Sequence, residues 1–182
     1  MAQIDQTERD LTMNASELEI SQLTKEPDEV LARHATHIDH LGIAVPSLSA
    51  AMATYETLLG GSVNHTEEVV DQKVRTAFFQ VGESAFELLE ATDDKSPIAR
   101  FLKRHPRGGL HHVCVAVDDI EAVLARYREA GVRLIDAQPR RGAHDKWVAF
   151  IHPASTGGVL LEVSQAGPLA SEQMSVQSTD HD

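Results

Sequence analysis

The chain has 182 residues, of which 42% are hydrophobic and 24% are charged, with a formal net charge of −12. This length allows one domain with a hydrophobic core, or two small modules that share one. The acidic balance disfavours nucleic acid as a partner, because proteins bind phosphates mainly through Lys and Arg. No apolar run approaches the roughly 18 residues of a membrane span, and no secretory signal pattern is present. We therefore expect a cytoplasmic protein with no membrane partner.

The acidic residues concentrate at the two ends of the chain. Residues 1–36 carry a net charge of −5 and residues 166–182 carry −3, which leaves −4 for the rest. Both ends are polar and offer little apolar surface to bury, so we expect a disordered acidic extension and a disordered tail. Residues 16–33 also have the spacing of a short amphipathic helix. An anionic small molecule remains compatible with the less acidic core.

The first half of the core begins with an apolar strand, expected from Ile38 to Val45 and closed by Pro46. A helix follows, capped by Ser47 or Ser49 and ended by the glycine pair at 60–61. Three more strands complete this half, at residues 62–70, 74–81 and 85–90.

The second half follows a short helix that starts at Ser96-Pro97 and ends near Arg104. A strand is expected at residues 111–117, and a helix capped by Asp118 or Asp119 should end at Gly131. The remaining strands are expected at residues 133–135, 147–152 and 158–164.

An internal repeat appears when the core is shifted against itself by 72 residues. His40 then matches His112, Tyr55 matches Tyr127, and the Ala-Phe pair at 77–78 matches the pair at 149–150. The pattern βαβββ therefore occurs twice, in modules of about residues 37–95 and 109–165. We expect an α+β domain over residues 37–165, whose two sheets pair across a pseudo-twofold axis with a cleft between them.

Each module presents a histidine on the small-residue face of its first strand. Because side chains alternate along a strand, His40 shares its face with Gly42 and Ala44, while the larger aliphatic residues take the other face. His112 has the same setting, next to the single cysteine, Cys114, which we expect to be a small buried residue. The adjacent His111 should point away from His112.

Two glutamates complete the pattern. Glu87 and Glu162 each lie inside an apolar run on the last strand of a module. A buried carboxylate needs a counter-charge or a metal, because its desolvation costs several kcal/mol. A single core His or Glu is usually structural, but two nitrogen and two oxygen donors repeated by symmetry suit one divalent ion. Co, Mn, Ni, Fe and Zn are all compatible with this ligand set.

Six strings within residues 37–165 resemble those of one enzyme family. They are HIDHLGIAVP from His37, FELLE from Phe86, SPIARFL from Ser96, GLHHV from Gly109, GAH from Gly142 and HPASTGGVLLE from His152. These strings resemble the methylmalonyl-CoA epimerases of the vicinal oxygen chelate superfamily. The resemblance implies paired βαβββ modules with a metal ion at their interface, and an acyl-CoA substrate.

By this resemblance the four metal ligands are His40, Glu87, His112 and Glu162. The implied reaction is epimerisation of methylmalonyl-CoA at C2, by proton abstraction through a metal-stabilised enolate. Glu162 is the expected base. Some family members carry a second candidate base, a glutamate, at the position of Thr76, which cannot fill that role. Either another group or a metal-bound or ordered water supplies the second proton, or the substrate differs. The candidate groups, which the sequence does not rank, are Glu68, His144 and Lys146.

The binding site for CoA is not defined by any phosphate-binding motif, since the chain has neither a P-loop nor a dinucleotide fingerprint. Two basic groups could receive the phosphates, Lys103-Arg104 with Arg107 and Arg140-Arg141 with Lys146, although each could equally be solvated surface. A glyoxalase I-like isomerase and a metal-free ligand-binding protein of the same fold are the alternatives. An extradiol-type dioxygenase would leave Glu87 without a role. Open sheet edges are compatible with a homodimer.

Overall fold

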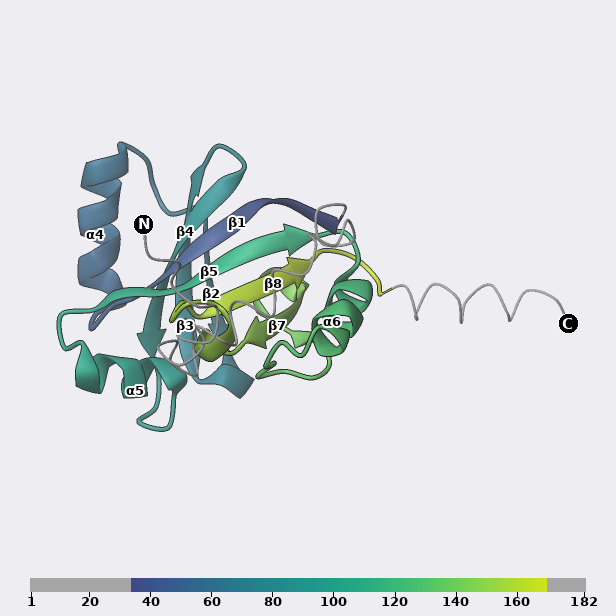
Figure 1. Cartoon of the computed structure of the whole chain (residues 1–182). Coiled ribbons are helices and arrows are strands. Elements are labelled where there is room, and N and C mark those ends of the chain that lie inside the picture. The colour runs from purple at the N-terminus through teal and green to yellow at the C-terminus, as the bar shows by residue number, and fades with distance from the viewer. Residues whose placement is uncertain (1–33, 170–182) are drawn as a thin grey trace, which may run out of the picture.

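The computed structural model describes residues 34–169, in which eight strands form one mixed sheet (Figure 1). The strand order is β2-β3-β4-β1-β5-β8-β7-β6. The strands are β1 (Ala35–Ala44), β2 (His65–Val69), β3 (Val74–Val81), β4 (Ser84–Ala91), β5 (Gly109–Val117), β6 (Arg140–Arg141), β7 (Trp147–Ile151) and β8 (Leu161–Gln165).

The two predicted modules meet along their first strands. β1 pairs with β5 in antiparallel orientation, and each of them pairs in parallel with the last strand of its own module, β4 or β8. Figure 1 shows β1 and β5 running side by side through the middle of the molecule. The prediction of an α+β domain built from two βαβββ modules is confirmed, with the two sheets joined edge to edge into one.

Three helices pack on this sheet, each starting and ending where the sequence predicts. They are α4 (Leu48–Leu59), α5 (Pro97–Arg104) and α6 (Ile120–Glu129). The hydroxyl of Ser47 accepts from a backbone N–H of α4, Ser96 does the same for α5, and the carboxylate of Asp119 caps α6. Gly60 ends α4 with a φ of 68°, a left-handed conformation that glycine adopts without strain.

The aliphatic faces of the central strands carry the helices, as predicted. One apolar cluster joins α4 to β1, β3 and β4, and a second joins α6 to β5, β7 and β8. A third, smaller cluster places Ile98 of α5 against Val74 and Leu89 on the opposite side of the sheet. The face that carries the histidines is thereby left without a helix except at the end that α5 covers.

Some predicted boundaries are wrong. The strand expected at residues 133–135 is reduced to one isolated bridge between Leu134 and Ile151, and the edge strand is instead β6. The backbone N–H groups of residues 135 and 136 both donate to the carbonyl of Phe150, so no regular ladder forms there. Regular pairing with β7 begins at Arg140, in β6. β8 begins at Leu161, three residues after the predicted start at residue 158. Gly157 and Gly158 both adopt positive φ, which an extended strand does not allow.

The described chain extends beyond the predicted domain at both ends. β1 begins at Ala35, and Leu169 is buried in the α6 cluster, so residues 166–169 are not part of a disordered tail. The amide of Gln165 donates to the carbonyl of Pro168, which holds this segment on the domain. The predicted helix at residues 16–33 and the remainder of the two predicted disordered ends lie outside the described residues. No helix within residues 34–169 is long and apolar enough to cross a membrane.

Candidate metal centre and active site

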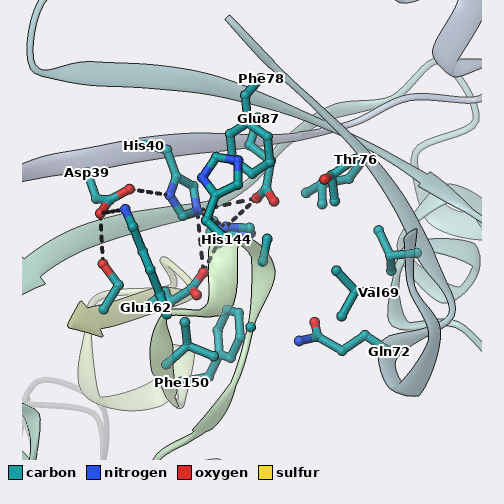
Figure 2. Close-up of a pocket in the computed structure, with 18 residues that line it drawn as sticks. Asp39, His40, Val69, Gln72, Thr76, Phe78, Glu87, His144, Phe150 and Glu162 are labelled. Carbon is teal, nitrogen blue, oxygen red and sulfur yellow. Dashed lines mark hydrogen bonds and ion pairs between the residues drawn. The ribbon is translucent and has the colours of Figure 1, made fainter. Parts of the chain in front are cut away.

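The four predicted ligands lie close together, and Figure 2 shows three of them, His40, Glu87 and Glu162, pointing toward one another. Nε2 of His40 lies 3.0 Å from Nε2 of His112. Oε2 of Glu87 lies 3.3 Å and 3.5 Å from these two nitrogens, and Oε2 of Glu162 lies 3.6 Å and 3.0 Å from them. All four side chains are at least nine-tenths buried. Strands of both modules thus bring together residues that are up to 122 positions apart.

These separations fit a single divalent ion. Donor atoms about 2.1 Å from an octahedral centre lie about 3.0 Å from their nearest neighbours, and the observed spacings of 3.0–3.6 Å are close to this value. His40, His112 and Glu162 have one ligand atom each within 4.8 Å of the others. Two imidazoles and two carboxylates also carry the charge and donor types that Co, Mn, Ni, Fe or Zn accept.

Two symmetry-related β-bulges orient the histidines. The β1–β5 register moves from Ile38–Val115 to His40–Cys114, so Asp39 is the extra residue on β1. It then moves from Gly42–His112 to Ile43–Leu110, which makes His111 the extra residue on β5. A bulge breaks the alternation of side chains, so the residue before each histidine can turn toward it.

Both bulged residues contact the outer nitrogen of the adjacent histidine. Asp39 lies 2.9 Å from Nδ1 of His40, and Nδ1 of His111 lies 3.0 Å from Nδ1 of His112. The prediction that His111 points away is therefore wrong. Since a carboxylate only accepts, His40 donates from Nδ1 and keeps the lone pair on Nε2 for a metal, an arrangement common around protein metal sites.

Asp39 connects His40 of the first module to Lys146 and Ser164 of the second. Its Oδ2 accepts from the ammonium of Lys146 and from the hydroxyl of Ser164, while its Oδ1 faces His40. Burial raises the pKa of Asp39, but the contacts with His40 and Lys146 outweigh burial and lower it well below its usual range. Asp39 therefore stays ionised and fixes the orientation of His40.

The protonation of the four central groups is strongly coupled. Burial opposes a charge on His112, but the carboxylates of Glu162 and Glu87 outweigh it and raise its pKa to about 9. Burial likewise opposes ionisation of Glu162, yet His112 and His40 lower its pKa to about 2. Without a metal, protons on the histidines thus compensate the two buried carboxylates. A metal ion would replace those protons.

The stability of the metal-free protein should fall as pH rises. The pKa of His112 is about 9 in the fold against 6.5 ordinarily, so its stabilising protonation is complete below pH 6.5 and is lost as pH rises through 9. This loss is on the order of 3 kcal/mol. Metal-loaded protein should behave oppositely, because metal competes with these protons. Melting temperatures with and without chelator should diverge from pH 6.5 to 9, and a constant or shrinking gap would contradict this assignment.

Gly42 makes room for the imidazole of His112, which lies directly opposite it across the β1–β5 pair. A Cβ at Gly42 would lie 2.1 Å from Cε1 of His112. We expect Gly42→Ala to rotate His112 away, lower the melting temperature and weaken metal binding more than about tenfold. Gly61→Ala is the matched control, since a Cβ there meets nothing within 4 Å. Equal metal affinities for the two variants, by calorimetric titration, would disprove the packing argument.

The four predicted ligands line a hollow of about 510 Å³, a volume that includes the space at its open mouth. Phe78 and Phe150, a pair matched by the 72-residue repeat, place their rings against His40 and His112 respectively. Val69 and Gln72 line the side opposite Asp39 (Figure 2). The hollow therefore combines apolar side chains with a smaller polar surface, as expected for a small-molecule site.

The three candidates for the second proton-transfer group differ clearly in position. Glu68 is half exposed, pairs with Arg75 at 3.7 Å and does not line the pocket. Lys146 lines it, but its ammonium is paired with Asp39. His144 projects into the pocket from the 3₁₀ helix η2 (Ala143–Asp145), with its ring 4.2 Å from that of Phe78 (Figure 2).

Thr76 also lines the pocket. It is fully buried, and its hydroxyl has no hydrogen-bond partner within the described residues. Cys114 is a free, buried cysteine opposite His40, as predicted, and burial raises its pKa to about 12. Neither residue therefore adds a charge near the four predicted ligands at neutral pH.

Comparison with known proteins identifies the family. Residues 39–150 match the model of the Glyoxalase/Bleomycin resistance protein/Dioxygenase superfamily. The mitochondrial methylmalonyl-CoA epimerase of Dictyostelium discoideum is 41% identical over 128 residues, which cover 70% of this chain and 77% of the relative. The ethylmalonyl-CoA/methylmalonyl-CoA epimerase of Cereibacter sphaeroides is 41% identical over 129 residues, covering 70% and 96%. The chain belongs to the methylmalonyl-CoA epimerase family.

A solved structure agrees with this assignment. The methylmalonyl-CoA epimerase of Streptomyces coelicolor, in complex with 2-nitronate-propionyl-CoA, superposes with a TM-score of 0.71 at 34% identity, covering 74% of this chain and 97% of its own. The predicted family and fold are thus confirmed. Membership of an epimerase family also favours the epimerase over the glyoxalase I-like alternative. Residues near the four predicted ligands that the sequence analysis did not assign to the site include Asp39, Gly42, His111 and Ser164.

Proposed function

We propose that this protein interconverts the two epimers at C2 of methylmalonyl-CoA with one divalent ion held by His40, Glu87, His112 and Glu162. The convergence of these four buried side chains at the floor of one pocket carries the proposal. The names of the relatives supply the substrate. A bound divalent ion would act as a Lewis acid on the thioester and carboxylate oxygens, where negative charge develops when the C2 proton leaves.

Glu162 is the base in this proposal. Its contacts with both histidines are made by Oε2, which leaves Oε1 outside them. Its pKa of about 2, set by burial against the stronger effect of His112 and His40, keeps it ionised at neutral pH. Because the carboxylate is buried, its electrostatic interactions with a bound substrate would be stronger than in water.

His144 is the second proton-transfer group in this proposal. It reaches across from the second module to Phe78 of the first, whereas Glu162 lies on β8, so the two groups approach the pocket from different walls. Burial lowers the pKa of His144, and the charges of His65 and Lys146 add to this effect. In one direction Glu162 takes the C2 proton while protonated His144 gives one to the opposite face; in the other direction their roles reverse.

The phosphates of CoA are assigned to the basic group at the end of α5. Arg140, Arg141 and Lys146 each pair with a carboxylate of their own chain, whereas Lys103, Arg104 and Arg107 are exposed. α5 packs against Val74 and Leu89, which also line the pocket.

The double variant Lys103→Ala/Arg104→Ala should raise KM at least about tenfold without changing kcat, because each charge-assisted hydrogen bond contributes about 1.5–3 kcal/mol. Arg128→Ala/Arg133→Ala removes the same charge from exposed positions of the second module and is the control. Steady-state kinetics at several salt concentrations check this assignment. Equal KM values for the two double variants would place the phosphates elsewhere.

A single epimer of methylmalonyl-CoA in deuterated water tests the function. Protein loaded with each of Co, Mn, Ni, Fe and Zn should exchange the C2 proton and produce the other epimer with at least one of these ions. Chelator should stop both processes. Failure of every metal form to exchange the proton would refute the proposed function. Localisation in the cytoplasm and a homodimer remain predictions.

A further inference from the structure

A second group of side chains that could hold a metal ion lies beside the pocket, outside the four central ligands, and shares His144 with the pocket lining. His65 and Glu67 are two positions apart on β2, so strand alternation places them on one face. His144 faces them from η2 of the other module, with its ring 4.5 Å from that of His65. The three residues have one ligand atom each within 4.8 Å of the others, and Nε2 of His65 lies 3.4 Å from Oε2 of Glu67.

The backbone holds the third member of this group in place. His144 has a φ of 56° and a ψ of 28°, a left-handed conformation that non-glycine residues seldom adopt. Its backbone N–H donates to Oε2 of Glu67 at 2.9 Å, and its ring packs on Phe78. The position of His144 relative to β2 is therefore fixed before any ion binds, which reduces the cost of assembling a site.

The donor set selects the class of ion. Two imidazole nitrogens and one carboxylate oxygen suit Zn²⁺, Ni²⁺ and Cu²⁺, and they do not suit Mg²⁺ or Ca²⁺, which prefer oxygen donors. His65 is about half exposed and Glu67 about one-third exposed, so an ion can enter from solvent and keep water at its remaining positions. The lowered pKa of His144 favours the neutral imidazole that metal binding requires.

We propose that His65, Glu67 and His144 form a second metal site, weaker than the buried one, that binds a Zn²⁺-class ion beside the pocket. The ion would link β2 of the first module to η2 of the second. It would also bind the imidazole of His144, which could then no longer transfer a proton, so excess zinc should inhibit the protein. This inhibitory consequence rests on the proposed function, because it needs His144 in turnover, whereas the binding itself does not.

Calorimetric titration of Zn²⁺ into chelator-treated protein tests the site directly. Wild type should bind two equivalents, the first tightly and the second weakly. His65→Ala should keep the first and lose the second. The matched control is His37→Ala, which removes an exposed imidazole from β1. Within residues 34–169, His37 belongs to no group of three side chains that could hold a metal ion, so this variant should bind two equivalents. A single equivalent in wild type, or equal stoichiometry in His65→Ala and wild type, would overturn the second site.

The activity experiment separates the two proposals. In protein loaded with the most active ion, added Zn²⁺ should inhibit wild type and His37→Ala alike. The inhibition midpoint of His65→Ala should be more than about tenfold higher, since even an outer partner of a metal ligand changes affinity 10–100-fold. Equal midpoints would overturn the inhibitory role. If no metal form is active, the proposed function fails, but the binding stoichiometry still decides whether the second metal site exists.

Discussion

Glu162→Gln is expected to slow exchange of the C2 proton of methylmalonyl-CoA by about 10²–10⁴-fold, the range typical for loss of a general base. The amide keeps the shape and one oxygen of the side chain but cannot accept a proton from carbon. In the fold, Oε2 of Glu162 lies 3.0 Å from Nε2 of His112. The oxygen of the glutamine can hold the same position at the metal. The measurement is deuterium incorporation from solvent, followed by mass spectrometry.

Glu87→Gln is the matched control for this substitution. Glu87 has the same burial, the same contacts with both histidines and a pKa lowered by them against the effect of burial. The side-chain oxygen of a glutamine can still act as a metal ligand, so Glu87→Gln should bind metal and keep most of its exchange activity. Metal stoichiometry measured on both variants separates loss of the base from loss of the ion. Near-normal exchange in Glu162→Gln would remove this residue from the role of base.

The four central side chains could be predicted because two simple rules apply to them. The 72-residue repeat relates His40 to His112, and strand alternation places both on the face that lacks large aliphatic residues. Glu87 and Glu162 stand out because a carboxylate inside an apolar strand requires a partner. The structure brings all four together within hydrogen-bonding or ion-pair distance. The burial of these four side chains, and their need for a partner, could therefore be predicted from the local sequence.

The surroundings of the histidines could not be predicted, because β-bulges break the rule that identified them. Alternation puts Asp39 and His111 on the helix side of the sheet, yet the bulges turn both toward the metal centre. The two residues occupy equivalent positions of the repeat, 72 apart, and a polar residue before each histidine was the available signal. The short edge strand β6 was missed for a different reason, since two residues carry no readable periodicity.

His144→Gln is expected to uncouple exchange from epimerisation. If Glu162 and His144 serve opposite faces of C2, loss of His144 leaves removal of the proton by Glu162 intact. The deuteron then returns to the face from which the proton left. The epimer whose proton faces Glu162 should exchange within about tenfold of the wild-type rate, while formation of the other epimer should fall by about 10²–10⁴-fold. Chiral analysis of the deuterated product measures both rates, and a parallel fall of the two would contradict the assignment.

Thr76→Glu in the His144→Gln background tests whether the missing group is a proton donor or a structural support. Thr76 is buried, lines the pocket and carries an unpaired hydroxyl, so a longer carboxylic acid there would project into the space that His144 also reaches. The family resemblance implies a glutamate at this position in some relatives. Recovery of epimerisation in the double variant is the expected result, because the lost function is proton transfer and not packing on Phe78. If the double variant is no better than His144→Gln although it still exchanges the proton, a group other than His144 completes the transfer in the native protein.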